Sequence, residues 1–353
     1  MPVNNREHRG RGNVTTGFTE KSAIESGFAQ IYDERIAPKL ERLTADRAGL
    51  RHRTRRDLLI IAGIGAVVAI AIPLILGSAW AWISFLVMTG AIILALLYVQ
   101  RRSKDWNAML IEAFMPDVCQ FLGDLRYDRE GAHDSFVTAF QDAGILRPSA
   151  KRTLTHHFAG SYRNTGFELV EAHLKRKKRN KDSSDSTIFN GLLFKIQVPA
   201  AIPGRIVIVP NYGAFMQKLA DALGPTSVRS LDVVPMDKPD FDERFTVRGE
   251  VPDGTRALLT PGFMDALLEI DEHEGGASQK RSLAAAFVDN TFLLTLTRHE
   301  QIFSLGPIKF ERPRPFLATR SILRDNPDLQ GTVHTMFDDI GVAYRVIDRL
   351  HGS

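Results

Sequence analysis

An unbroken apolar tract over residues 58–99 constrains the fold of this chain most, because it contains no Asp, Glu, Lys, Arg or His. The hydrocarbon core of a bilayer is about 30 Å thick and a helix rises about 1.5 Å per residue, so one span needs roughly 20 residues. The tract therefore predicts two antiparallel transmembrane helices, over residues 58–76 and 80–99. Gly77, Ser78 and Ala79 provide the tight turn between them.

The residues that flank the tract predict its orientation. Basic residues gather on both sides: Arg47, Arg51, Arg53, Arg55 and Arg56 before it, and Arg101, Arg102 and Lys104 after it. Because cytoplasmic flanks carry the excess of Lys and Arg, we expect a two-pass protein with both termini in the cytoplasm. Trp80 and Trp82 suit the far membrane interface, and Tyr98 suits the near one.

Small residues in the first span leave the question of helix packing open. Gly63, Gly65, Ala66 and Ala69 would allow close approach of another helix, including one from a second copy of the chain. Such residues are also common in any membrane helix, so they do not by themselves indicate an oligomer.

Composition narrows the function further. The 353-residue chain has one cysteine, Cys119, which excludes an internal disulfide and a multi-cysteine metal site and suits a reducing cytoplasm. Its position in an apolar helical pattern indicates a buried, unreactive thiol. Part of the net charge of +4 belongs to the membrane flanks, so it is weak evidence for nucleic acid. We expect no cofactor, no metal and no nucleic-acid partner.

The pattern along the chain predicts an α+β protein: a transmembrane hairpin with flanking helices, then a cytoplasmic domain of mainly antiparallel sheet with helices. The expected parts are a disordered tail (1–18), an amphipathic juxtamembrane helix (19–56), the hairpin (57–100), a helical connector (101–150), the α+β domain (151–310) and a C-terminal helical segment (311–353).

Local signals predict individual elements. Helices are expected over residues 19–48 with a kink at Pro38, 105–126 with a break at Pro116, 134–142, 212–223, 260–274 and from Asn326-Pro327 onward. A meander of strands is expected from Phe158 through residues 186–210, with short strands at 245–248 and 256–259 and a hairpin that turns at Asp289 and Asn290.

Several stretches together resemble an uncharacterised bacterial, membrane-anchored domain-of-unknown-function family, whose members are sometimes loosely labelled galanin-like. They are HHFAGSYRNTGFELVEAHLKRK, IFNGLLFKIQVP with GRIVIVPN, DFDERFTVRG, TRALLTPGFMDALLEI and AAFVDNTFLLTL. The resemblance implies a protein of the bacterial inner (cytoplasmic) membrane with no established activity, so it transfers no catalytic residue. Members are often encoded near small LemA-type membrane proteins, which implies such a protein as a membrane partner.

Few residues in the sequence suggest catalysis. The groupings that a metal site could use are His156-His157, His299-Glu300 and the cluster Asp271, Glu272, His273 and Glu274. None has the spacing of HExxH, and GxSxG, P-loop and GxGxxG patterns do not occur. The two adjacent histidines should point to opposite faces of a strand. The acidic cluster at a helix end is most simply solvated.

The strongest charge run is basic and lies between two predicted strands. It comprises Lys175, Arg176, Lys177, Lys178, Arg179 and Lys181. The run is most simply a solvated hairpin loop. In a protein tethered to an anionic leaflet, the same residues would also suit lipid headgroups. They lack the interleaved aromatic residues that bind nucleic-acid bases.

These observations favour a membrane-anchored, cytoplasm-facing interaction or scaffold protein that binds membrane lipids and either a LemA-type protein or itself. The spans contain no ionisable residue, which argues against a proton relay. Two alternatives stay open. One is a membrane-tethered enzyme, in which a pocket would bring His156 or His157 together with Asp289 or His299. The other is a sheet domain that senses anionic lipid.

Overall fold

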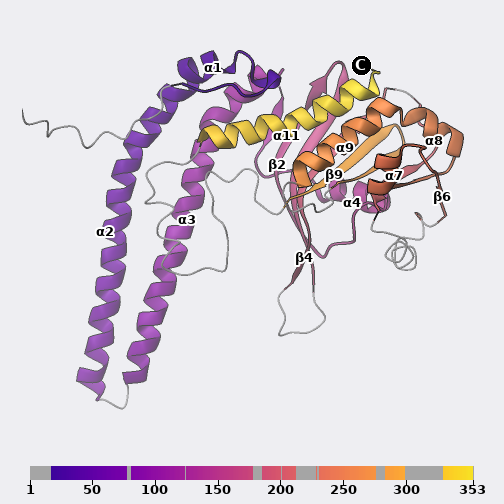
Figure 1. Ribbon diagram of the computed structural model, residues 1–353. Coiled ribbons are helices and arrows are strands. Elements are labelled where there is room, and N and C mark those ends of the chain that lie inside the picture. The colour runs from indigo at the N-terminus through magenta and orange to yellow at the C-terminus, as the bar shows by residue number, and fades with distance from the viewer. Residues whose placement is uncertain are drawn as a thin grey trace, which may run out of the picture. The chain divides into compact units, whose positions relative to one another are not determined.

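The computed structural model describes residues 17–77, 81–123, 125–177, 185–199, 201–211, 228, 230–275, 283–298 and 329–352. The described chain forms two compact units. The first contains the residues up to Asp117 together with Leu329 and Gln330, and the second begins at Val118 and includes Gly331 onward. Figure 1 shows the elements of each unit.

The first unit begins with short helical turns, which are η1 (Ala23–Glu25), α1 (Phe28–Ile31) and a π-helical turn, η2 (Tyr32–Ile36). Phe18, which the sequence assigned to the tail, is buried and packs edge-on against the ring of Phe28 at 5.1 Å. The chain then continues as α2 (Ala37–Leu76). Pro38 lies in the first turn of α2, directly after the π-helical turn η2, in which the Ala37 N–H bonds to the Tyr32 carbonyl. The predicted kink at Pro38 stays a prediction.

The second long helix is α3 (Ala81–Phe121). The predicted break at Pro116 is wrong, since the helix passes through this residue. Proline removes one backbone hydrogen bond, but the neighbouring Phe114, Met115 and Val118 are buried and hold the turn by packing. The helix ends before Arg126, where the sequence had still predicted helix and where a strand begins.

The described strands form one nine-stranded sheet in the order β1-β2-β3-β4-β9-β8-β5-β7-β6, and all pairs are antiparallel. Their bounds are β1 (Arg126–Asp128), β2 (Lys151–Tyr162), β3 (Thr165–Arg176), β4 (Ser186–Gln197), β5 (Ile206–Pro210), β6 (Asp232–Val233), β7 (Phe245–Gly249), β8 (Leu283–Val288) and β9 (Thr291–Thr297). The α+β fold class is thus confirmed.

The strand order differs from a simple meander. β2, β3 and β4 follow one another as predicted, but β5 pairs with β7 and β8 and does not pair with β4. The β8–β9 hairpin occupies the place beside β4. Its turn is the predicted one, and both Asp289 (φ 46°) and Asn290 (φ 58°) adopt the left-handed conformation that a tight two-residue hairpin requires.

Helices cover both faces of the sheet (Figure 1). They are α4 (Asp134–Asp142), α7 (Pro239–Arg244), α8 (Pro252–Leu258), α9 (Pro261–Gly275) and α11 (Leu329–Leu350). The predicted helices 134–142 and 260–274 are confirmed, as is the apolar stripe of the last helix. The predicted strand 256–259 is wrong, because Pro252 starts a helix there. The predicted helix 212–223 lies outside the described residues.

The core has two layers, one on each face of the sheet. On one face, Phe136 and Phe140 of α4 pack in a cluster with Val170 of β3 and Leu193 of β4. On the other face, the ring of Phe263 in α9 contacts the rings of Phe287 and Phe292 from the β8–β9 hairpin. α11 packs on this second face, where Tyr344 meets the ring of Phe167 in β3.

Candidate functional site

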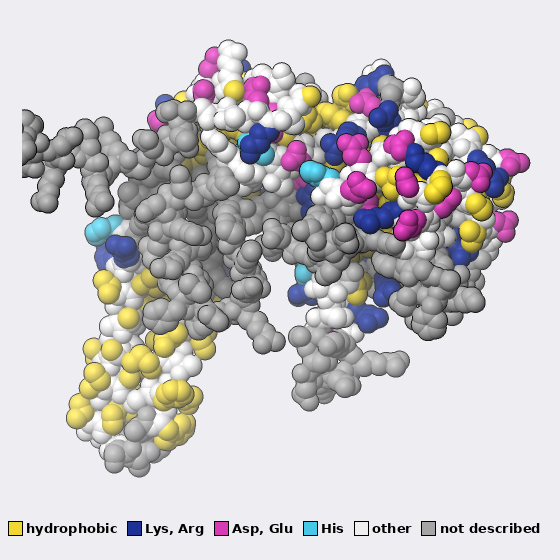
Figure 2. Space-filling view, viewed as in Figure 1, with side chains coloured by type: hydrophobic (Ala, Val, Ile, Leu, Met, Phe, Trp, Pro, Cys, Tyr) yellow, Lys and Arg dark blue, Asp and Glu magenta, His cyan; other side chains and the backbone are white. Residues whose placement is uncertain are grey.

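The most unusual surface of the described chain is the apolar hairpin of α2 and α3, which Figure 2 shows surrounded by hydrophobic side chains. Two stretches, His52–Ile75 and Trp82–Val99, are long and apolar enough to cross a membrane, judged by length and composition. Their large side chains point outward, and Leu74 and Phe85 are 79% and 73% exposed. Beyond this hairpin, the exposed large hydrophobic residues of the described chain are Met109, Val233 and Val251.

Three contacts fix the register between α2 and α3. A Cβ added at Gly65 would lie 2.8 Å from the Cβ of Ala91, so the two helices touch closely there. The Tyr98 hydroxyl donates to Asp57 Oδ2 at 2.6 Å, which joins the two helices at the charged end of the apolar region. The small residues of the first span therefore pack partly within the hairpin itself, while Gly63 faces open space.

The third contact lies further along the two helices. Lys39 Nζ donates to Asp117 Oδ2 at 2.5 Å, and the Asp117 side chain is only 10% exposed. About 18 residues separate Lys39 from Asp57 on α2, which at about 1.5 Å per residue is roughly 27 Å of helix. Asp117 and Tyr98 are about equally far apart on α3, so the pairing keeps one register over this length. We call the part of α2 and α3 between these two contacts the stalk.

The predicted basic run lies at one end of the sheet. Lys175 and Arg176 end β3, and Lys177 follows it. In the register of β2 and β3, Lys151 lies opposite Lys175, which adds a fourth cation to the same end. The other predicted lipid-contact residues, Lys178, Arg179 and Lys181, lie outside the described residues. We refer to Lys151, Lys175, Arg176 and Lys177 as the basic end of the sheet.

The two adjacent histidines point to opposite faces, as predicted. A bulge between Thr155 and Phe158 accommodates them, and His156 has a φ of 53°. His157 Nε2 lies 3.0 Å from Glu168 Oε2 on the α4 face. This hydrogen bond lowers the pKa of Glu168.

His156 is enclosed on the other face. Its Nδ1 lies 2.7 Å from the Tyr127 hydroxyl, and its Nε2 lies 4.0 Å from Glu171 Oε2. Burial, with a smaller effect from Arg129, lowers the pKa of His156 to about 4. The imidazole is therefore neutral near pH 7, and its position in the sheet is that of a structural residue.

The predicted enzyme pocket does not assemble within the described chain. Asp289 lies in the turn of the β8–β9 hairpin, beside the end of β4, whereas the two histidines lie against the middle of β3. His299 and Glu300 lie outside the described residues. Among the residues that the structure describes, no group of three or more His, Cys, Asp or Glu side chains is arranged to hold a metal ion.

The acidic cluster at the end of α9 also separates. Asp271 is fully buried, pairs with Arg244 of α7 and accepts the backbone N–H of Leu283 at 3.0 Å. Glu272 and His273 are exposed. Asp271 thus fastens α9 to α7 and to the start of β8, which gives it a structural role.

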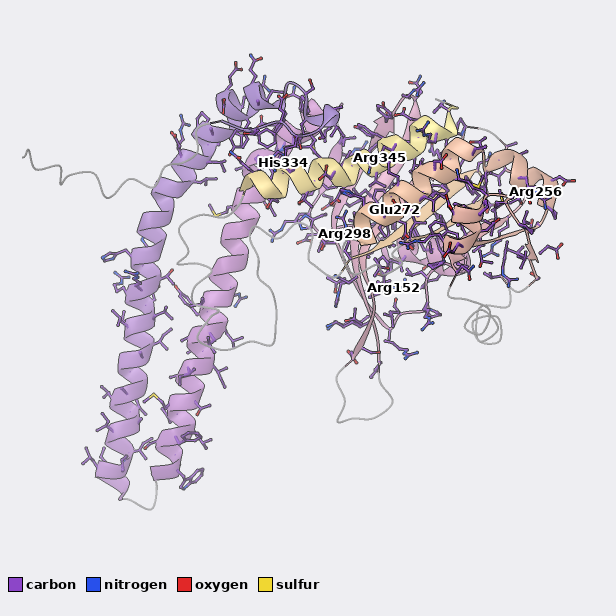
Figure 3. All side chains as sticks on the ribbon, in the orientation of Figure 1. Arg152, Arg256, Glu272, Arg298, His334 and Arg345 are labelled. Atoms are coloured by element: carbon purple, nitrogen blue, oxygen red, sulfur yellow. The ribbon has the colours of Figure 1, made fainter. Side chains whose placement is uncertain are left out.

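Sequence reasoning missed a polar network under α11. Arg298 follows β9, and its Nη1 lies 2.5 Å from Asp339 Oδ1 (Figure 3 labels Arg298). Asn190 of β4 donates to the Arg298 carbonyl at 3.0 Å, and His173 Nδ1 lies 3.0 Å from Asn190 Oδ1. Asp339 is fully buried. The available signal was its helical spacing from the apolar Met336 and Ala343, which indicates a position on the buried stripe.

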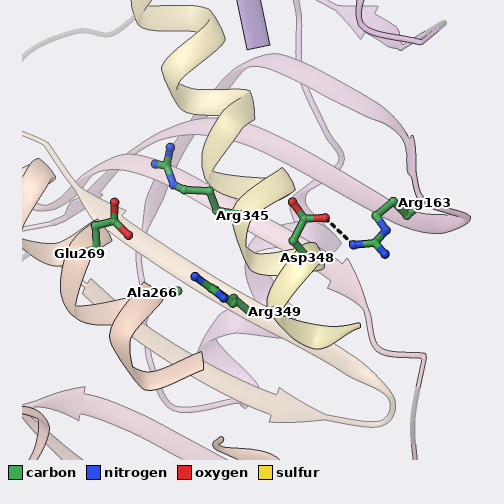
Figure 4. A pocket seen from close by; sticks show the side chains of 6 residues that line it. All are labelled: Arg163, Ala266, Glu269, Arg345, Asp348 and Arg349. Carbon is green, nitrogen blue, oxygen red and sulfur yellow. Dashed lines mark hydrogen bonds and ion pairs between the residues drawn. The ribbon is translucent and has the colours of Figure 1, made fainter. Parts of the chain in front are cut away.

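An open groove lies between α9 and α11 (Figure 4). Its volume is about 330 Å³. It is lined by Arg163, Ala266, Glu269, Arg345, Asp348 and Arg349. Arg163 Nη1 donates to Asp348 Oδ1 at 2.9 Å across one rim. Long charged side chains of both signs suit a polar protein surface more than an apolar small molecule.

The described chain is therefore an α+β protein with two apolar helices and an antiparallel sheet. Residues 187–351 match a family model described as Protein of unknown function (DUF3137). The match begins in β4 and extends through α11, and it confirms the predicted resemblance to an uncharacterised domain family. The apolar hairpin precedes the matched residues, so this match does not bear on membrane anchoring.

Other comparisons are distant. Among solved structures, the chain is similar to the crystal structure of the mycobacterial trehalose monomycolate transport factor A, TtfA. The identity is 8% and the TM-score is 0.30, with 69% of this chain and 95% of that chain covered. No curated protein matches the sequence.

Proposed function

We propose that this protein is a membrane-anchored interaction protein. In this proposal, α2 and α3 cross the bacterial inner membrane as a hairpin, both termini lie in the cytoplasm, and the sheet domain is the interacting part. The observation that carries the proposal is the ring of exposed apolar side chains on the hairpin.

The energetics of that surface support membrane insertion. Each Leu, Ile, Val or Phe near the middle of a membrane helix favours insertion by about 0.3 to 0.6 kcal/mol. The two stretches expose fourteen such side chains. The total is therefore several kcal/mol. A soluble monomer rarely exposes apolar patches larger than a few hundred Å². The exposed apolar side chains of the hairpin lie along both helices, so a lipid environment accounts for them best.

The polar contacts of the hairpin support the orientation. The bond between Tyr98 and Asp57 lies where the apolar region meets the arginine-rich flank. Beyond it, the stalk extends by roughly 27 Å and carries the basic residues that favour the cytoplasmic side. The sheet domain follows directly, because Val118 is the next residue of the same helix.

The sheet domain supports interaction more than catalysis. Its buried polar groups, such as Asp271 and Asp339, are paired within the fold and join helices to the sheet. The groove between α9 and α11 instead carries charged side chains at the surface. These can form new ion pairs with a protein partner, and we propose a small LemA-type membrane protein or a second copy of this chain.

Site-specific labelling tests the topology. Burial raises the pKa of the Cys119 thiol to about 12, so the native cysteine should resist maleimide. The labelling of each introduced cysteine can therefore be measured without a background from Cys119. In intact spheroplasts, a membrane-impermeant maleimide should label Ser78→Cys at the sequence-predicted turn. Thr19→Cys and Val251→Cys should react only after lysis. Labelling of Thr19→Cys and Val251→Cys from opposite sides would contradict the proposed topology.

Photocrosslinking tests the interaction role. A photoreactive amino acid at Arg345, in the groove, should give a defined crosslinked species in native membranes. The same amino acid at Val233, on the edge strand β6, is the control. A crosslink to a second copy of the chain would support self-assembly, and a crosslink to a small membrane protein would support recruitment. Equal, diffuse crosslinking at both positions would contradict the groove as the interacting surface.

A further inference from the structure

Four cations gather at the basic end of the sheet, and none of them has a carboxylate partner within the described residues. Elsewhere on the sheet domain, several Lys and Arg side chains form ion pairs: Lys195 with Glu168, Lys238 with Asp265, Arg244 with Asp271, Arg256 with Asp253 and Arg298 with Asp339. Lys151, Lys175, Arg176 and Lys177 form none with the described part of the chain.

The register of the strands concentrates these charges. Lys151 begins β2, and its Cα partner is Lys175 near the end of β3. Like charges directly opposite each other on paired strands repel, so the arrangement costs stability. The neighbouring Arg152, labelled in Figure 3, is different because it donates to Gln141 Oε1 and to the Asp134 carbonyl of α4. The four remaining cations project a positive field that the described domain does not neutralise.

We propose that the basic end of the sheet binds anionic phospholipid headgroups of the leaflet that holds the hairpin. This inference rests on the proposed membrane anchor and adds a lipid contact to it. Each basic residue near an anionic leaflet favours the bound state about fivefold. Neutralising Lys175, Arg176 and Lys177 should therefore reduce the ratio of docked to undocked domain by roughly 100-fold. Tethering by the hairpin lets such weak contacts act at high effective concentration.

The test uses the full chain in lipid nanodiscs with a fluorophore on Thr187→Cys. Thr187 is exposed on β4 and is the register partner of Lys175. Nitroxide-headgroup lipids in the disc quench a probe that lies at the membrane surface. The control probe, Ser161→Cys, lies at the opposite end of β2. Discs of phosphatidylcholine alone are compared with discs that contain phosphatidylglycerol.

The Thr187 probe should be quenched more strongly in anionic discs than in neutral ones, and 0.5 M salt should relieve the difference because the contact is exposed to screening. The variant K175Q/R176Q/K177Q should lose the quenching. The variant R126Q/K238Q/R256Q, which removes the same charge from other surfaces, should keep it. Slow alkylation of Cys119 verifies that each variant is folded, and the salt effect on the wild-type chain tests the contact without any substitution.

Several results would overturn the lipid contact. They are equal quenching in neutral and anionic discs, equal quenching of the Thr187 and Ser161 probes, and retention of quenching in K175Q/R176Q/K177Q. Displacement of the probe from anionic discs by a short RNA, through the same three residues, would identify nucleic acid as the partner and refute lipid binding. A chain that fails to co-float with the discs would refute the membrane anchor itself, whereas an inserted chain without quenching refutes only the docking.

Discussion

Removing the carboxylate of Asp339 should strongly destabilise the sheet domain. Arg298 Nη1 lies 2.5 Å from Asp339 Oδ1, and the two side chains are 14% and 0% exposed. When one partner of a buried ion pair is lost, the remaining charge stays away from water, at a cost of about 3–5 kcal/mol. We therefore expect Asp339→Ala to lower the free energy of unfolding by roughly 3–4 kcal/mol, a large part of the stability of a typical domain.

Pulse proteolysis in urea is a suitable assay, with the full chain kept in detergent micelles. Tryptophan fluorescence would not report on this domain, because Trp80, Trp82 and Trp106 all precede it in the sequence. With a urea dependence of about 2 kcal/mol per M, the unfolding midpoint of Asp339→Ala should fall by roughly 1.5–2 M.

Two further variants make the result decisive. The double variant R298M/D339L should recover most of the loss, because apolar side chains of similar size can replace a buried pair. Asp348→Ala removes the exposed pair with Arg163 and should lower the midpoint by only about 0.2 M. If Asp339→Ala shifts the midpoint no more than Asp348→Ala does, the Arg298–Asp339 pair does not hold α11 on the sheet.

Three other predictions concern packing, pH and thiol chemistry. Gly65→Leu should separate α2 from α3 and destabilise the hairpin by about 1–3 kcal/mol, measured as loss of resistance to SDS, whereas Gly63→Leu should be tolerated because it faces open space. The folded-state pKa of His156, about 4, lies below its unfolded value of 6.5, so stability should fall by on the order of 3 kcal/mol as the pH drops from 6.5 to 4. His156→Asn should flatten this part of the urea-midpoint profile, while the exposed His133→Asn should not. Cys119 should react with a maleimide at pH 8 only in denaturant, because burial raises the pKa of its thiol to about 12.

Local features were predictable from the sequence because their causes are local. The apolar tract and its glycine turn define two helices, and the structure has α2 and α3 on either side of that turn. The Asp289-Asn290 turn and the Thr260-Pro261 helix start are likewise set by the conformational preferences of a few neighbouring residues. Proline was misleading at Pro116, since burial of the neighbouring side chains outweighs the cost of the lost backbone hydrogen bond there.

Long-range features were not predictable, because residues far apart in the sequence create them. The β8–β9 hairpin lies between β4 and β5 in the sheet, and no local pattern records which edge an incoming hairpin will join. The pairing of Arg298 with Asp339 likewise depends on where α11 packs. A polar residue on a buried helical stripe shows only that a partner is needed, and the fold supplies its identity.

The basic end of the sheet combines both kinds of information. The sequence contains the run from Lys175 onward, but only the antiparallel register adds Lys151 from the start of β2. Several cations of this domain pair with a carboxylate within the fold. Repulsion between facing lysines would favour the same arrangement here unless something outside the domain compensated. An anionic leaflet next to the proposed anchor provides that compensation. Repulsion between Lys151 and Lys175 is therefore the physical reason to look for an anionic ligand at the basic end of the sheet.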